Sequence, residues 1–227
     1  MINTVLLDLD DTIFDFKACE RQALVNAFLA LGIPFSEEVA SKYTVINDSV
    51  WKKLERREIT RERLKVERFR ILLDECGLEA DPERLSDAYA DRLSETNALI
   101  DGAIDFLREL SARYRLYAVT NGFESIQMGR IRAANIDKYF REIFISQKIG
   151  SDKPGAAFFD YCRDRIGFSI ESTALVGDSL TSDVKGGVAY GLYTIWYDPN
   201  GLPCGEICPS AVARTYGEVL DILQRVD

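Results

Sequence analysis

The chain has 227 residues, of which 47% are hydrophobic and 29% charged, and it carries a formal net charge of −9 but no histidine. The absence of histidine excludes Ser-His-Asp and Cys-His catalysis. The acidic charge argues against binding nucleic acid polymers or anionic membranes, because their phosphates would be repelled. The start lacks the segments of a signal peptide, and no apolar run approaches the roughly 18 residues of a membrane span. Together with an odd number of cysteines, five, these features predict a cytoplasmic protein with reduced thiols.

Strand-like and helix-like segments alternate over most of the chain, in the order typical of a parallel sheet with helices on both faces. Strands are predicted at residues 4–8, 115–120, 143–146, 173–177 and 192–197, and helices at 123–135, 156–167 and 183–190. The predicted fold class is therefore α/β, with a doubly wound, mainly parallel, Rossmann-like sheet.

The block between the first two strands, residues 16–98, contains no convincing strand. Its apolar residues recur at helical spacing, for example at Leu24, Ala27, Phe28 and Leu31. We therefore expect a helical insertion here. The α/β core is then formed by residues 1–15 and 99–227.

The first strand ends in the acidic sequence Asp8-Leu9-Asp10-Asp11-Thr12. Side chains alternate along a strand, so Asp8 and Asp10 are expected on the same side. Carboxylates bunched at the end of a buried strand repel each other, and they stay ionised only beside a cation or hydrogen-bond donors. The sequence indicates either an acidic turn or, if further groups lie nearby, a site for phosphoryl chemistry.

Two later segments offer such groups. Thr120, Asn121 and Gly122 end the second strand with a hydroxyl, an amide and an open backbone N–H, which suit phosphate oxygens. Lys153 is a compact positive charge, and Pro154 beside it suits the first turn of a helix.

A further acidic segment begins where the fourth strand ends. It runs from Gly177 and Asp178 through Ser179 to Asp183. Ligands of doubly wound sheets bind outside the carboxyl ends of the strands. We therefore expect all of these segments to converge at one edge of the sheet.

In their order, these segments resemble the four motifs of the haloacid dehalogenase-like superfamily of phosphotransferases. The matching residues are Asp8 to Thr12, Thr120, Lys153 with Pro154, and Gly177 to Asp183. The resemblance spans nearly the whole chain. It implies that residues 16–98 form a helical cap, which closes over the site and excludes water.

The resemblance also implies catalytic roles. Asp8 is the nucleophile that becomes an aspartyl phosphate. Asp10 protonates the leaving oxygen and then takes a proton from water. Thr120 and the N–H groups of the next two residues hold the phosphoryl oxygens, and Lys153 balances the charge of the nucleophile.

The resemblance implies a bound cation as well. Mg²⁺, for which Mn²⁺ can substitute, is expected to bind Asp8, Asp178 and the main-chain carbonyl of Asp10, because all of these are hard oxygen ligands. Asp183 is expected to orient Lys153 or a metal-bound water, and Ser179 is expected to lie next to the ligands without binding the ion.

Within the superfamily, the chain resembles the house-cleaning pyrimidine nucleotidases, which remove the 5′-phosphate from nucleoside monophosphates. Beyond the core motifs, the similarity lies in residues 12–16, 45–51, 59–60 and 68–69. A nucleobase needs an aromatic face and a few polar groups at its edge. The candidates for substrate contacts are Phe14, Phe16, Asn47, Trp51 and Arg68. Packing within the protein explains the aromatic residues equally well.

Other functions fit part of the pattern. A broad-specificity phosphatase of sugar phosphates or phosphoglycolate shares these motifs, and so does a sugar phosphomutase. A haloacid dehalogenase needs no metal and no acid at the position of Asp10, so Asp10 and Asp178 argue against it. The non-enzyme alternative is a phospho-accepting signalling or interaction module, but receiver modules lack a cap. The sequence is compatible with a monomer or a homodimer.

Overall fold

Six parallel strands form one sheet in the computed structural model, which describes residues 1–226. The strand order is β3-β2-β1-β4-β5-β6, which places β1 inside the sheet between β2 and β4. The strands are β1 (Thr4–Leu7), β2 (Arg115–Thr120), β3 (Glu142–Ile145), β4 (Thr173–Gly177), β5 (Tyr193–Tyr197) and β6 (Ala211–Ala213).

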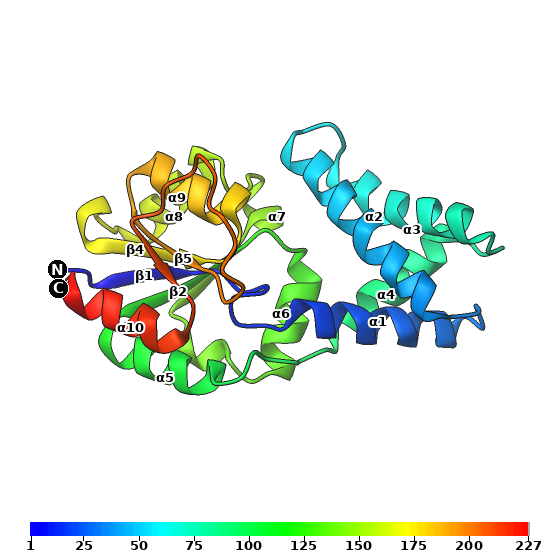
Figure 1. The fold of residues 1–227 in the computed structure, drawn as a ribbon, viewed down its shortest axis with the longest axis horizontal. Helices are drawn as coiled ribbons and strands as arrows, with labels where there is room; N and C mark the ends of the chain where they lie inside the picture. The colour runs from blue at the N-terminus through cyan, green and yellow to red at the C-terminus, as the bar shows by residue number, and fades with distance from the viewer. Residues whose placement is uncertain (227) are drawn as a thin grey trace. The chain divides into compact units, whose positions relative to one another are not determined.

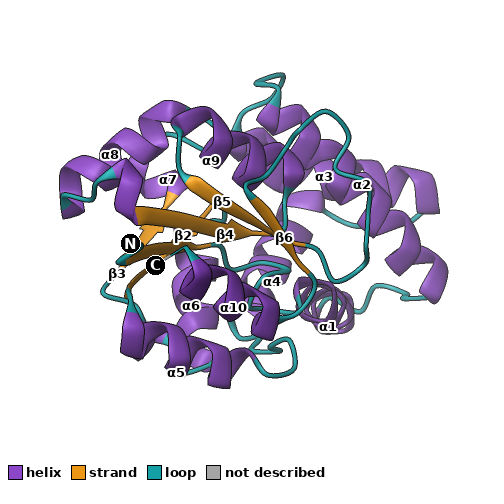
Figure 2. Ribbon diagram, turned by 60° about the vertical axis from the view of Figure 1, so that its left-hand side comes forward, coloured by secondary structure: helices purple, strands orange, loops and turns teal. Residues whose placement is uncertain are grey.

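Helices cover both faces of this sheet (Figure 2). Apolar residues of α5, α6 and α10 pack on one face, and those of α7, α8 and α9 pack on the other. These helices are α5 (Ala103–Arg113), α6 (Glu124–Ala133), α7 (Ser146–Ile149), α8 (Ala156–Ile166), α9 (Lys185–Tyr190) and α10 (Tyr216–Arg225). Short 3₁₀ turns lie at Asp137–Tyr139 and Ile170–Ser172, and a π-helical turn lies at Leu180–Val184. The two helical layers confirm the predicted doubly wound α/β fold.

The sequence of β1 explains its place inside the sheet. Val5 and Leu7 belong to the apolar cluster beneath α5 and α10, whereas Leu6 belongs to the cluster beneath α8. Consecutive apolar residues are typical of strands that are buried on both faces. The backbone N–H of Asp8 still donates to the Val176 carbonyl at 2.9 Å. Asp8 therefore continues the alternation on the α8 side of the sheet.

The carboxyl ends of β1, β2 and β4 lie side by side because these strands are parallel neighbours. Leu7 is in register with Ala118 of β2 and with Val176 of β4. Asp8 and Asp178 consequently leave the sheet at the same edge, next to the end of β2. This edge is where ligands bind in doubly wound sheets.

Some elements differ from those predicted. The helix expected at residues 183–190 begins earlier, as the π-helical turn Leu180–Val184, and continues as α9. Pro154 is not in the first turn of a helix, since α8 begins only at Ala156. The peptide bond between Lys153 and Pro154 is cis. β6 was not predicted, because a strand of three residues is too short to show a period.

A second compact unit, Lys17–Thr96, consists of four helices, while Met1–Phe16 and Asn97–Asp227 form the first unit. The helices, coloured blue to green in Figure 1, are α1 (Phe16–Ala30), α2 (Glu37–Glu55), α3 (Arg61–Cys76) and α4 (Pro82–Ser94). The side chains of the residues that precede α2, α3 and α4 accept hydrogen bonds from backbone N–H groups and so cap these helices: Ser36, Thr60 and Asp81. Within residues 1–226, no helix is long and apolar enough to cross a membrane.

The junctions between the units lie between Phe16 and Lys17 and between Thr96 and Asn97. Phe16 belongs to the α/β unit, where its ring lies 5.4 Å from the Arg130 guanidinium. Asn97 also belongs there, since its Nδ2 donates to the Ala133 carbonyl at 3.4 Å. These contacts connect the residues at both junctions to the α/β unit.

The interior of the helical unit combines stacked aromatic rings with a buried polar network. The rings of Tyr43 and Phe69 stack with their centroids 5.3 Å apart, and the Arg68 guanidinium lies 5.0 Å from the Phe69 centroid. Arg68 Nη1 donates to Asn47 Oδ1 at 3.0 Å. Asn47 Nδ2 in turn donates to Glu20 Oε1 at 2.8 Å. The network provides partners for polar groups that would be costly to bury alone.

Glu20 has an altered proton affinity within this network. Burial raises the pKa of Glu20 from its ordinary 4.5 to about 7, although hydrogen bonds from Thr44 and Asn47 oppose the shift. Between these two pKa values, Glu20 therefore keeps its proton in the folded chain and releases it in the unfolded chain. The stability from this proton is fully present below the unfolded pKa and is lost as the pH rises through the folded pKa.

We predict that Glu20→Gln removes this pH-dependent loss, because the amide cannot ionise. Relative to the unchanged protein, the variant should gain up to about 3 kcal/mol in unfolding free energy between about pH 5 and pH 8. Urea unfolding of both proteins at the two pH values measures the difference. A difference that is the same at both pH values would contradict the raised pKa.

Candidate active site

The ammonium group of Lys153 lies at the centre of the predicted site. Its Nζ donates to Asp8 Oδ1, to Asp183 Oδ1 and to the Val119 carbonyl oxygen, each at 2.7 Å. Lys153 is 1% exposed, and these contacts use all of the donors that an ammonium group has. The lysine thereby joins the ends of β1 and β2 to the turn that precedes α9.

The charges around Lys153 do not balance. Burial raises the pKa of Asp8 to about 8, with a further increase from Asp183 that Lys153 partly offsets. Burial and the neighbouring carboxylates also raise the pKa of Asp178 well above its usual range. For Lys153, burial opposes the charged form, but the two carboxylates outweigh it and raise the pKa. An additional cation would relieve the excess of negative charge.

Asp183 is held by donors on both of its carboxylate oxygens. Oδ1 accepts from Lys153, and Oδ2 accepts from the Ser179 N–H at 3.1 Å. Ser179 also caps the π-helical turn, since its Oγ accepts from the Ser182 N–H at 3.2 Å. The carboxylate lies against the backbone of Gly177, where a Cβ would be 2.5 Å from Asp183 Cγ. Glycine at the end of β4 therefore allows Asp183 to reach the lysine.

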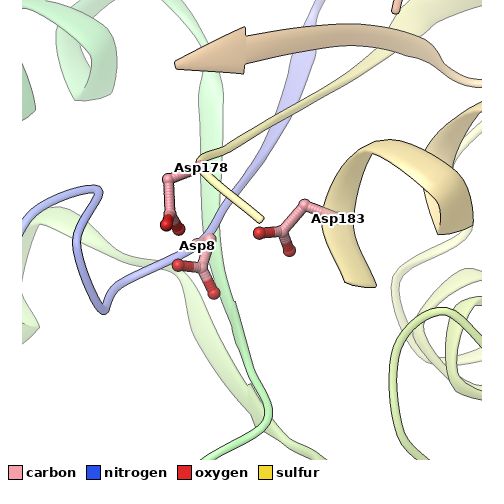
Figure 3. A group of neighbouring side chains, drawn as sticks. All are labelled: Asp8, Asp178 and Asp183. Carbon is pink, nitrogen blue, oxygen red and sulfur yellow. The ribbon is translucent and has the colours of Figure 1, made fainter. Parts of the chain in front are cut away.

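Asp178 is fixed by contacts from separate parts of the α/β unit. Its main-chain carbonyl accepts from Trp196 Nε1 at 2.7 Å, and its Oδ1 accepts from the Thr12 hydroxyl at 3.3 Å. The Tyr216 hydroxyl in turn donates to the Thr12 carbonyl at 2.8 Å. Asp178 is thus held beside Asp8, as Figure 3 shows.

Asp8, Asp178 and Asp183 form a group of carboxylates that could hold a metal ion (Figure 3). One ligand atom from each lies within 4.8 Å of the other two. The donor set consists of carboxylate oxygens, which Mg²⁺ prefers. The uncompensated negative charge described above favours a cation at the same place. These residues therefore fit Mg²⁺.

The hydroxyl of Thr120 is held at the end of β2. Its Oγ1 accepts from the Gly122 N–H at 3.2 Å and from Gln127 Nε2 at 2.8 Å. Because the oxygen is the acceptor in both contacts, the hydroxyl proton can still donate to a phosphoryl oxygen.

The side chain of Asn121 supports the backbone of Lys153. Asn121 Nδ2 donates to the Lys153 carbonyl at 2.8 Å, and Asn121 Oδ1 accepts from the Lys153 N–H at 2.9 Å. This pair of hydrogen bonds holds the lysine-bearing turn against the end of β2. The sequence motif predicts Asn121 only as part of a phosphate cradle, and this second role depends on the folded turn.

The side chain of Asp10 is turned toward α6. Its Oδ2 accepts from Gln127 Nε2 at 2.9 Å, and its Oδ1 pairs with Arg130 Nη1. Arg130 is fully buried, with its guanidinium 4.1 Å from the centroid of the Phe14 ring. Gln127 and Arg130 are not predicted from the sequence, because such residues on a helix form no recognisable motif. Their spacing, which places them on one helical face, is the only signal that the sequence offers.

The residues proposed to contact the substrate fall into two groups. In the α/β unit, Phe14 is fully buried beneath the α6 guanidinium, and Phe16 is partly exposed. In the helical unit, Asn47 and Arg68 are buried in the polar network, whereas Trp51 on α2 is partly exposed.

Comparison with known proteins gives consistent matches along the chain. Residues 2–191 match the family of haloacid dehalogenase-like hydrolases. A HAD-hydrolase of Bacillus subtilis, YfnB, is 40% identical over 222 residues, which cover 97% of this chain and 94% of that protein. A crystal structure of YfnB, described as bound to magnesium and as revealing interdomain movement, has a TM-score of 0.93 and covers 98% of both chains.

Two proteins named as pyrimidine 5′-nucleotidases are also similar. PynA of Streptococcus pneumoniae is 36% identical over 97% of this chain and 94% of its own length. YjjG of Escherichia coli is 29% identical over 85% of this chain and 84% of its own length. The match to PynA therefore extends over both structural units.

We predict that Gly177→Ala disrupts the site through Asp183. The added Cβ must displace a carboxylate that Lys153 and Ser179 hold, so the free energy of unfolding should fall by about 1–3 kcal/mol. Urea unfolding measures the loss. Gly217→Ala is the matched control, because a Cβ there meets nothing closer than 3.8 Å, and alanine favours the helix α10. Equal effects of the two substitutions would contradict the close approach at Gly177.

Proposed function

Since this chain belongs to the haloacid dehalogenase-like hydrolase family, we propose that it is a magnesium-dependent 5′-nucleotidase that acts on pyrimidine nucleoside monophosphates through Asp8. The family confirms the resemblance inferred from the four motifs, and the relatives support a phosphoric monoester hydrolase. The observation that carries the proposal is the buried ammonium of Lys153, which holds Asp8 beside two further carboxylates.

In the first proposed step, a carboxylate oxygen of Asp8 attacks the phosphorus of the substrate. The bond between phosphorus and the leaving oxygen breaks as the bond to Asp8 forms, which gives an aspartyl phosphate. Asp10 donates a proton to the leaving oxygen of the nucleoside. Lys153 orients Asp8 through the 2.7 Å contact. Thr120 donates its hydroxyl proton to a phosphoryl oxygen, and the N–H groups of the following loop assist it.

In the second proposed step, water attacks the phosphorus and the bond to Asp8 breaks. Asp10, now ionised, takes a proton from this water, so phosphate leaves and both carboxyl groups return to their starting forms. Two carboxylates with different duties need different surroundings. Asp8 contacts Lys153, whereas Asp10 contacts Gln127 and Arg130.

Asp8, Asp178 and the main-chain carbonyl of Asp10 are the proposed ligands of Mg²⁺. When bound, the ion would neutralise the charge of the transferring phosphoryl group. Support comes from the carboxylate donor set and from the crystal structure of YfnB, which is described as bound to magnesium. Asp183 is proposed to orient Lys153, because both of its carboxylate oxygens already accept hydrogen bonds.

A nucleotide substrate is supported by the relatives PynA and YjjG, which are both named pyrimidine 5′-nucleotidases. Among the candidate contacts, Phe16 in the α/β unit and Trp51 in the helical unit are partly exposed. Exposed aromatic faces are the surfaces on which nucleobases stack. Phe14, Asn47 and Arg68 would need to gain exposure before they could contact a base.

We predict that the protein releases phosphate from dUMP, dTMP and UMP with a higher kcat/KM than from AMP or from sugar phosphates. The reason is that a site for a nucleobase adds contacts that a sugar phosphate cannot make. Initial rates of phosphate release over a range of substrate concentrations measure this order. A clear preference for a sugar phosphate or phosphoglycolate would overturn the nucleotidase assignment while leaving the phosphatase mechanism intact.

The same assay tests the metal. Excess EDTA should abolish the release of phosphate, and added Mg²⁺ should restore it. Independently of activity, Mg²⁺ should raise the Tm of the unchanged protein and should raise that of Asp178→Asn much less. Asp221→Asn, on the exposed side of α10, is the matched control and should keep the full shift. Undiminished turnover in EDTA would rule out the proposed metal.

A further inference from the structure

One amide group of α6 joins two of the residues placed in the reaction. Gln127 Nε2 lies 2.9 Å from Asp10 Oδ2 and 2.8 Å from Thr120 Oγ1. Arg130 Nη1 pairs with Asp10 Oδ1 and also donates to Gln127 Oε1 at 3.0 Å. Both carboxylate oxygens of Asp10 therefore contact donors from the same helix.

The two α6 side chains are themselves firmly held. Gln127 is 1% exposed and Arg130 is fully buried. The Arg130 guanidinium lies 4.1 Å from the Phe14 centroid and 5.4 Å from the Phe16 centroid, as is favourable for a cation over aromatic rings. A Cβ on Gly122 would be 2.5 Å from Gln127 Cγ, so the loop after β2 fits closely over the glutamine. Donors held in this way can in turn fix the group that they contact.

Stability alone does not account for this arrangement. Burying an arginine and an amide costs free energy that apolar side chains of similar size would not cost. The side chain of Asp10 is 30% exposed and can be solvated, so it does not need a buried partner. The Gln127 amide and the Arg130 guanidinium are nevertheless buried, and both contact the Asp10 carboxylate. Such an arrangement is typical of a site that orients a reacting group.

We propose that Gln127 and Arg130 are positioning residues that fix the Asp10 carboxylate for its two proton transfers. This inference rests on the proposed function, in which Asp10 protonates the leaving oxygen and then takes a proton from water. Each carboxylate oxygen has a second lone pair, so Asp10 can carry the transferred proton while it keeps its contacts with α6. Gln127 also contacts Thr120, whose hydroxyl is proposed to hold a phosphoryl oxygen. The glutamine therefore fixes the position of the Asp10 carboxylate relative to the Thr120 hydroxyl.

The dependence of the rate on the leaving group tests this role. The 5′-oxygen of UMP needs a proton as it leaves, whereas the phenolate of 2,4-dinitrophenyl phosphate leaves without one. The parameter to compare is kcat/KM, because it covers the steps up to formation of the aspartyl phosphate. We expect Gln127→Met and Arg130→Met to lower kcat/KM for UMP by about 100-fold or more, and to lower it for the aryl phosphate by less than about fivefold.

Further variants separate positioning from folding. Arg130→Lys keeps the positive charge but not the planar pair of donors. Its kcat/KM for UMP should therefore lie between those of the unchanged protein and Arg130→Met. Arg132→Met removes an exposed arginine from the same helix and should leave kcat/KM unchanged for both substrates. The Mg²⁺-dependent shift in Tm should persist in all α6 variants, which shows that the carboxylate group near Lys153 is intact.

Asp10→Asn distinguishes failure of this inference from failure of the proposed function. It should show the same selective loss on UMP. If Asp10→Asn shows that loss but the α6 variants lower kcat/KM equally for both substrates, Gln127 and Arg130 are structural residues and the inference is wrong. If Asp10→Asn itself does not distinguish the two substrates, the proton-transfer role of Asp10 is wrong, and the inference is wrong with it. A faster reaction of Arg130→Met with UMP would also overturn the inference.

Discussion

The buried ammonium of Lys153 is the contact on which the rest of the site depends. It lies 2.7 Å from both Asp8 and Asp183, in a place where the lysine is 1% exposed. Without this ammonium, the carboxylates at the ends of the buried strands would repel each other, because little water is present to screen their charges. Asn121 holds the backbone of the lysine, and Gly177 leaves space for Asp183. Asn121 and Gly177, which belong to the motif segments, thus help to fix Lys153 and its partner Asp183 in place.

The end of β2 connects this lysine network to the network on α6. The Val119 carbonyl accepts from Lys153, and the hydroxyl of the next residue, Thr120, accepts from Gln127. Lys153 precedes α8 on one face of the sheet, whereas Gln127 belongs to α6 on the other face. Asp8 and Asp10 are two residues apart in sequence, yet each belongs to a different network. This separation gives the two carboxylates the different surroundings that the proposed nucleophile and proton donor require.

The sequence predicted five of the six strands and the edge at which the motif residues meet, because parallel strands end at the same edge and Asp8, Thr120 and Asp178 each lie at the end of a strand. Contacts that depend on packing could not be predicted in this way. Asn121 pairs with Lys153, 32 residues later in the chain, only once the turn before α8 is folded. Gln127 and Arg130 belong to a helix whose polar residues Ser125 and Arg132 are exposed, and only the tertiary structure shows that Gln127 and Arg130 are buried. Phe14 was a candidate for nucleobase stacking, but the same guanidinium covers its ring.

A phosphoryl group bound transiently to Asp8 is the most direct consequence of the proposed mechanism. It can be observed by mixing the protein rapidly with UMP that carries radiolabelled phosphate, quenching in acid within a single turnover, and mapping the labelled peptide. We expect label on the peptide that contains Asp8, appearing and decaying at rates compatible with turnover, and no label in Asp8→Asn. Label on a different residue, or normal turnover by Asp8→Asn, would contradict the assignment of Asp8 as the nucleophile.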